Sequence, residues 1–254
     1  MNRGNLPTAF RRVFFTAALS AGLLFWSAGS SLAAPAAASE SVRIESRDSR
    51  EVMGTLTVDL RIPVFSGMPD VAFQSHLNEE IAGIIARAVR DMKEQYARDE
   101  SDANKGSLPS WNHDLYVRTT VTFNKAGILS FYLEIYRFTG GAHGMTERKQ
   151  YNVDLQNSRF LSLGDLFEKD FDYVRSINAE VEKQILIRPG EFFREKNMGF
   201  ETILADQPFY IGREGIVVYF EPYQIAPYST GFPEFVIPLD VLPIVAWPPR
   251  GAPG

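Results

Sequence analysis

The chain has 254 residues, of which 45% are hydrophobic and 22% are charged, a balance typical of a globular protein with a sizeable core. Its formal net charge is −5 at pH 7, and the absence of cysteine excludes disulfides, thiolate catalysis and cysteine zinc sites. An acidic chain is a poor partner for nucleic acid or an anionic membrane surface, and a better one for a cationic protein.

The N-terminal segment has the pattern of a secretory signal peptide. Arg3, Arg11 and Arg12 precede an uncharged apolar run, and small residues follow it. We therefore predict a signal peptide over residues 1–34 and a periplasmic or secreted bacterial protein. The alternative is an uncleaved membrane anchor, because residues 13–34 have roughly the 20 residues that a bilayer needs. Removal of residues 1–34 takes three of the 26 basic residues and none of the 31 acidic ones, which leaves a net charge of −8.

The first patterned segments after the leader predict a strand and a long helix. Apolar residues alternate with polar ones over residues 55–62, as in a half-buried strand, and Pro63 ends the pattern. After Asp70, apolar residues recur at three- and four-residue steps as far as Tyr96, which predicts an amphipathic helix of about seven turns. We interpret residues 99–112, which include glycine and proline, as a long connection.

Strands dominate the rest of the chain. Three alternating segments joined by short turns predict an antiparallel meander over residues 116–123, 128–138 and 146–155. Apolar residues from Phe171 to Ile185 predict a second amphipathic helix, which Pro189 and Gly190 stop. Further strands are predicted over residues 209–212, 216–220 and 235–239.

These elements predict an α+β fold with antiparallel sheets, each packed by one amphipathic helix, in two interleaved subdomains. We expect an N-terminal α+β subdomain over residues 42–138, built from a strand, the long helix and a hairpin. A C-terminal α+β subdomain over residues 139–242 and a flexible tail over residues 243–254 follow.

The least ordinary segment is the turn between two predicted strands, where one of the three histidines lies among glycines. Gly140, Gly141 and Gly144 allow a positive φ or a close backbone approach, and they leave His143 with little side-chain cover. One interpretation is a recognition site made of backbone groups and the imidazole. The other is a tight connection whose histidine bonds the neighbouring loop, since turn geometry alone accounts for each glycine.

No catalytic motif is present: neither a nucleophile elbow, a zinc-protease helix, a phosphate loop nor a dinucleotide-binding glycine pattern occurs. We therefore expect no cofactor and no catalytic residue. His76 and Glu80 are four residues apart on the predicted helix, a spacing compatible with metal binding. An isolated His–Glu pair on a helix is more often a surface interaction, so we expect no metal site. His113, next to Asp114, is interpreted in the same way as hydrogen-bonded surface.

Several segments carry a resemblance to a bacterial family of exported domains of unknown function. They are FTGGAHG (138–144), YNVDL (151–155), LSLGDLF (161–167) and a later run that includes YFEPYQIAPY (219–228). The family is found in RsiV-like lysozyme-sensing anti-sigma factors and beside the catalytic domain of PdaC-type peptidoglycan deacetylases. The resemblance spans about residues 42 to 242.

The resemblance implies a non-catalytic recognition domain of the cell envelope, whose ligand is a cationic protein such as lysozyme, or cell-wall glycan. Nucleic acid is not an expected partner, and a membrane is one only through an uncleaved N-terminal segment. The candidate ligand-binding residues are Gly140, Gly141, His143, Gly144, Tyr223 and Tyr228, because aromatic side chains are favoured at sugar and protein contacts.

Neither activity named for the family's members is expected here. No cytoplasmic sigma-binding segment precedes the apolar run, and no separate catalytic domain is present. An alternative is a cell-wall hydrolase with His143 as general base, oriented by Glu221 or Asp154. A purely structural envelope protein is the third hypothesis.

Overall fold

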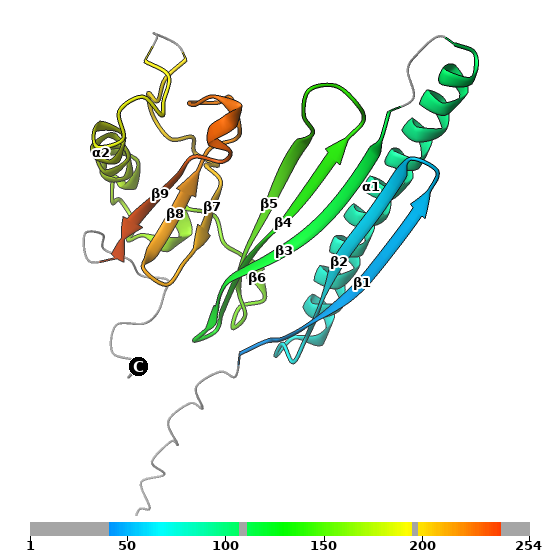
Figure 1. Cartoon of the computed structure of the whole chain (residues 1–254). Coiled ribbons are helices and arrows are strands. Elements are labelled where there is room, and N and C mark those ends of the chain that lie inside the picture. The colour runs from blue at the N-terminus through cyan, green and yellow to red at the C-terminus, as the bar shows by residue number, and fades with distance from the viewer. Residues whose placement is uncertain (1–40, 107–110, 195–197, 240–254) are drawn as a thin grey trace, which may run out of the picture. The chain divides into compact units, whose positions relative to one another are not determined.

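The computed structural model describes residues 41–106, 111–194 and 198–239; the predicted signal peptide and the tail over residues 243–254 lie outside them. Within these ranges the chain forms two β-sheets, each with one α-helix packed against it (Figure 1). The predicted α+β class is confirmed. None of the described helices is both long enough and apolar enough to cross a membrane.

The first sheet has six strands in the order β1-β2-β3-β4-β5-β6. Their bounds are β1 Arg43–Met53, β2 Leu56–Ser66, β3 His113–Lys125, β4 Ile128–Phe138, β5 Met145–Asp154 and β6 Arg159–Phe160. Strands β3, β4 and β5 form the predicted antiparallel meander. Strands β2 and β3 instead pair in parallel, with Leu56 opposite His113, because the helix between them provides the crossover that a parallel pair requires.

Helix α1 (Val71–Asn104) packs on this sheet and is longer than its sequence pattern predicts. It begins at the N-cap Asp70, whose side chain accepts a hydrogen bond from the Phe73 backbone N–H at 3.0 Å. The interpretation of residues 99–104 as part of a connection is wrong. They contain no glycine or proline, so the helix continues to Asn104; Gly106, with φ of +73°, follows the C-cap Lys105.

The apolar stripe of α1 forms the first core together with the inner face of the sheet. Its buried residues are Leu77, Ile81, Ile84, Ile85, Ala88, Met92 and Tyr96. They join one cluster with buried strand residues such as Phe65 and Phe131, whose rings lie 4.6 Å apart. The periodic pattern therefore predicted correctly which face of the helix is buried.

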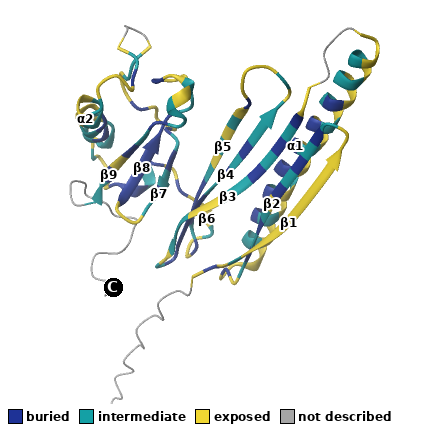
Figure 2. Ribbon diagram, viewed as in Figure 1, coloured by how far each residue is buried: buried dark blue, intermediate teal, exposed yellow. Residues whose placement is uncertain are grey.

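Strand β1 has no counterpart in the sequence-based prediction, and Figure 2 shows why. Almost all of its residues are exposed, so the apolar alternation that identifies a half-buried strand is missing. Strand β2 also continues past its predicted end at Pro63 to Ser66. Beyond Leu60, β2 pairs only with β1, and proline is tolerated in a strand with one free side.

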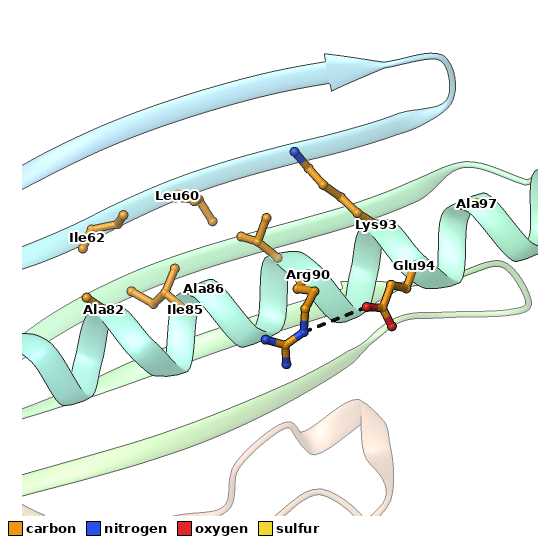
Figure 3. A pocket seen from close by; sticks show the side chains of 10 residues that line it. Leu60, Ile62, Ala82, Ile85, Ala86, Arg90, Lys93, Glu94 and Ala97 are labelled. Atoms are coloured by element: carbon orange, nitrogen blue, oxygen red, sulfur yellow. Dashed lines mark ion pairs between the residues drawn. The ribbon is translucent and has the colours of Figure 1, made fainter.

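An apolar groove of about 640 Å³ lies between α1 and β2 (Figure 3). Leu60 and Ile62 from the strand, and Ala82 and Ala86 from the helix, are among its lining residues. The charged side chains at its rim already have partners, because Lys93 pairs with Glu51 at 2.7 Å and Arg90 pairs with Asp91 and Glu94. The groove therefore offers apolar surface and few free polar groups.

The second sheet has the order β7-β8-β9 and is antiparallel throughout. Its strands are β7 Phe209–Ile211, β8 Gly215–Tyr219 and β9 Glu234–Pro238, and short 3-10 turns occur at η1 Gly164–Leu166 and η2 Tyr228–Thr230. Helix α2 (Tyr173–Leu186) buries Ile177 and Val181 in a second core with this sheet. The second predicted helix and the three late strands are thus present.

A buried polar bridge joins β7 to the first sheet, on the face of β4 and β5 opposite the α1 core. Ser130 and Asn152, 0% and 3% exposed, alternate with Phe131 and Tyr151, which belong to that core. The Ser130 hydroxyl donates to Asn152 Oδ1 at 2.7 Å and accepts from the Ile211 backbone N–H at 2.9 Å. The Asn152 amide donates to the Phe209 carbonyl at 2.9 Å, so each end of the bridge is satisfied.

Candidate functional site

Two loops far apart in the sequence place three aromatic rings against one another. The glycine-rich turn between β4 and β5 carries His143, and the loop between β8 and β9 carries Tyr223 and Tyr228. The His143 and Tyr228 rings stack with centroids 4.1 Å apart and 15° between their planes. Tyr223 lies 5.5 Å from Tyr228, centroid to centroid. We call His143, Tyr223 and Tyr228 the aromatic cluster.

Hydrogen bonds fix the orientation of these rings around one carbonyl group. His143 Nδ1 lies 2.9 Å from the Gly144 oxygen, and the Tyr228 hydroxyl donates to the same oxygen at 2.5 Å. Because a carbonyl oxygen only accepts, His143 Nδ1 donates this hydrogen bond. The Tyr223 hydroxyl lies 3.4 Å from the other ring nitrogen, Nε2.

Glycine is required at three positions of the turn for separate structural reasons. Gly140 and Gly141 have φ of +96° and +91°, in the region that favours glycine. A Cβ on Gly140 would also lie 2.8 Å from Trp111 Cγ, and a Cβ on Gly144 would lie 2.6 Å from the Arg137 carbonyl oxygen. Backbone geometry and close packing therefore explain all three glycines.

Tyr223 combines exposure with backbone strain. Its side chain is 53% exposed and its φ is +70°, which costs a non-glycine residue of order 1–3 kcal/mol. The neighbouring residues hold this conformation, since Gln224 N–H donates to the Glu221 carbonyl and Glu221 N–H donates to the Gln224 side chain, each at 3.0 Å. Strain held in this way at an exposed aromatic residue is a feature of ligand-contact loops.

Glu221, at the start of the same loop, is a half-buried acid without a partner. Within the described ranges its carboxylate makes no hydrogen bond and no ion pair. Burial raises the pKa of this carboxyl group above its usual 4.5; the positive charge of Arg148 opposes the rise and the negative charge of Glu147 adds to it. A ligand cation at this position would compensate the desolvated charge.

Arg148 links the first sheet to the second. Its side chain is 8% exposed and forms ion pairs with Glu134 of β4 at 2.8 Å and with Glu234 of β9 at 2.5 Å. The guanidinium carbon also lies 4.2 Å from the ring centroids of Tyr132 and Phe232. The sequence does not reveal this role, because a single arginine in an alternating strand has the pattern of a surface residue.

The carboxylates considered as orienting groups for His143 do not contact it. Asp154 lies at the opposite end of β5, where its side chain accepts from Asn157 and pairs with Arg159. Glu221 makes no bond to the imidazole, as described above. Both ring nitrogens instead face the Gly144 carbonyl and the Tyr223 hydroxyl.

The other two histidines occupy different environments. His113 opens β3 and is 2% exposed, so its interpretation as a surface residue is wrong; Nε2 lies 2.8 Å from Asp99 of α1 rather than bonding Asp114. His76 is exposed on α1. In the part of the chain that the structure describes, no group of three or more His, Asp or Glu side chains is placed to hold a metal ion.

The geometry therefore defines a two-sheet α+β domain that presents an aromatic cluster on its loops. Residues 50–146 match the family described as Deacetylase PdaC, and residues 164–240 match the family described as Protein of unknown function (DUF3298). The chain carries these two sequence signatures one after the other, and the resemblance predicted from its motifs is confirmed.

Two curated relatives, both from Bacillus subtilis (strain 168), are similar to the chain at low identity. Anti-sigma-V factor RsiV is 26% identical over 194 residues, which cover 73% of this chain and 64% of RsiV. Peptidoglycan-N-acetylmuramic acid deacetylase PdaC is 24% identical over 159 residues, which cover 59% of this chain and 32% of PdaC. The chain thus spans less than two thirds of either relative.

Two crystal structures of DUF3298 family proteins share the fold. The protein from Bacteroides fragilis NCTC 9343 superimposes with a TM-score of 0.60 at 20% identity, covering 80% of this chain and 92% of the other. The protein from Pseudomonas aeruginosa PAO1 does so with a TM-score of 0.55 at 21% identity, covering 80% and 93%.

Proposed function

We propose that this chain is a non-catalytic recognition domain of the bacterial cell envelope, exported to the periplasm or secreted, whose ligand surface is the aromatic cluster. The observation that carries the proposal is the exposed and strained Tyr223, packed beside the stacked rings of Tyr228 and His143. Gly140, Gly141 and Gly144 belong to the site because they shape the turn that presents His143.

The ligand that fits best is a cationic protein such as lysozyme. Tyrosine faces attract lysine and arginine side chains, and the carboxylate of Glu221 has no partner among the residues that the structure describes. The net charge of −8 after loss of residues 1–34 would speed the encounter with a basic protein. Cell-wall glycan is the other ligand that aromatic faces suit, and PdaC is named for an activity on peptidoglycan.

The surroundings of His143 support a binding role over catalysis. No carboxylate of the described ranges contacts the imidazole, and its Nδ1 bonds a backbone carbonyl. A general base needs a free nitrogen near the proton that it removes, and here Nε2 faces the Tyr223 hydroxyl at 3.4 Å.

The test is calorimetric titration of the chain from residue 35 onward with hen egg-white lysozyme and, separately, with soluble peptidoglycan fragments. We expect lysozyme binding that weakens as salt is added. Tyr223→Ser should weaken it by about 30-fold, the effect of losing about 2 kcal/mol at an aromatic hot spot. Leu186→Ser, which removes an 80% exposed apolar side chain from α2, is the matched control and should leave affinity unchanged. Absence of binding to both ligands at low salt would contradict the proposal.

A further inference from the structure

A second concave site lies beside the edge of β5, apart from the aromatic cluster. Strand β6 pairs with β5 only at Val153 and Asp154, and the last link is the Leu161 N–H to the Asn152 carbonyl at 2.7 Å. After Leu161 the chain leaves the sheet, and a cavity of about 310 Å³ lies between it and β5. We call this cavity the β5 fork. Its lining residues are Glu80, residues 149–152, residues 160–163, Asp206, Gln207 and Phe209.

The open edge of β5 presents backbone groups to this cavity. In an antiparallel ladder the N–H and C=O of a residue point to one side, and the side alternates along the strand. Asn152 points toward β6, because its carbonyl accepts from Leu161. Gln150, two residues earlier, points to the same edge, where no strand of the sheet pairs with it within the described residues. A peptide can pair with such an edge as an added strand.

Charged side chains of both signs surround this edge. The Tyr151 hydroxyl donates to one oxygen of Glu80 at 3.1 Å and leaves the other oxygen available. The side chains of Lys149 and Asp206 make neither a hydrogen bond nor an ion pair in the described part of the chain. Phe160, 41% exposed, adds an aromatic surface.

We propose that the β5 fork binds a short peptide with free termini. Its backbone amide pairs with Gln150, its ammonium group lies between Glu80 and Asp206, its carboxylate contacts Lys149 and its side chain packs on Phe160. The volume is near the lower end of the range of about 300–1,000 Å³ for ligand pockets, which limits the occupant to about dipeptide size. This site does not depend on the aromatic cluster.

The experiment is an NMR titration of the chain from residue 35 onward with alanylalanine, its N-acetyl form and its C-terminal amide. We expect alanylalanine to shift the backbone amides of Gln150 and Gln207. Each capped form should bind about tenfold more weakly, as expected for the loss of one charge-assisted hydrogen bond. Lys149→Gln should weaken alanylalanine binding to a similar extent. Lys125→Gln, an exposed lysine at the end of β3, is the control that should leave it unchanged.

Four results would overturn the proposal: no shift with alanylalanine, equal affinity for the capped forms, an unchanged affinity of Lys149→Gln, or stronger binding of N-acetylglucosamine, which would assign the site to a sugar. Thermal unfolding of both lysine variants should match the wild type, because both side chains are exposed. Lysozyme binding should be the same in Lys149→Gln and wild type, so failure here is separable from failure at the aromatic cluster.

Discussion

Replacing Arg148 with methionine tests whether a buried cation holds the two sheets together. The guanidinium is 8% exposed and pairs with Glu134 and Glu234, whose side chains are 30% and 36% exposed. Removing one partner of a buried ion pair costs about 3–5 kcal/mol, because the remaining charge is left uncompensated. Solvent reaches both glutamates here, so we take the lower end and expect a loss of about 3 kcal/mol. For a domain of about 200 residues, this lowers the melting temperature by roughly 6–12 °C.

The matched control is Arg137→Met in the neighbouring strand. Arg137 is 35% exposed and pairs with Glu147 at 3.2 Å, an arrangement worth about 0–1 kcal/mol. Urea unfolding followed by circular dichroism gives both free energies of unfolding. If the two variants differ from each other by less than about 1 kcal/mol, Arg148 does not have the structural role that its contacts indicate. If Arg148→Met greatly lowers the free energy of unfolding, it should also weaken lysozyme binding, because the two loops of the aromatic cluster adjoin β5 and β9.

Three further expectations concern Tyr223, Glu221 and Asp99. Tyr223→Gly should be more stable than Tyr223→Ala by about 1 kcal/mol in urea unfolding, because only glycine relieves the positive φ; equal stability would contradict the strain. Lysozyme affinity should rise as the pH increases through the raised pKa of Glu221, above its usual 4.5, and calorimetry should find this rise absent in Glu221→Gln. The hydrogen bond from His113 lowers the pKa of Asp99 below 3.8. The wild type should therefore be more stable than Asp99→Asn by its full margin above pH 3.8, and this margin should shrink as the pH falls through the lowered pKa. If acid unfolding shows a constant difference in the free energy of unfolding, the Asp99–His113 pairing is contradicted.

The sequence predicted the elements whose apolar residues face a core. The stripe from Phe73 to Tyr96 and the alternation in β4 repeat with the helical and strand periods, so both elements were found. Strand β1 was missed because it is exposed on both faces, and the end of α1 was missed because polar residues continue a helix as long as nothing interrupts it. The parallel β2–β3 pair depends on the path of the crossover, which periodicity does not encode.

The candidate site was partly visible in the sequence. Gly140, Gly144 and His143 stood out because glycine and histidine are unusual together in a turn. Tyr223 and Tyr228 stood out because aromatic side chains are favoured at sugar and protein contacts. These two segments meet only in the tertiary structure, because the second sheet packs on β4 and β5. Arg148 carried no local signal, because one of its two partners, Glu234, lies 86 residues away. Glu221 was considered only as an orienting group for His143, because its burial is not visible in the sequence.

The most direct test of the proposed function is hydrogen–deuterium exchange of the chain from residue 35 onward, with and without saturating lysozyme. We expect slower exchange in residues 139–145 and 221–231, which contain the aromatic cluster, and unchanged exchange along the α1–β2 groove. Protection confined to the groove or to β1, with residues 139–145 and 221–231 unaffected, would show that the aromatic cluster is not the ligand surface.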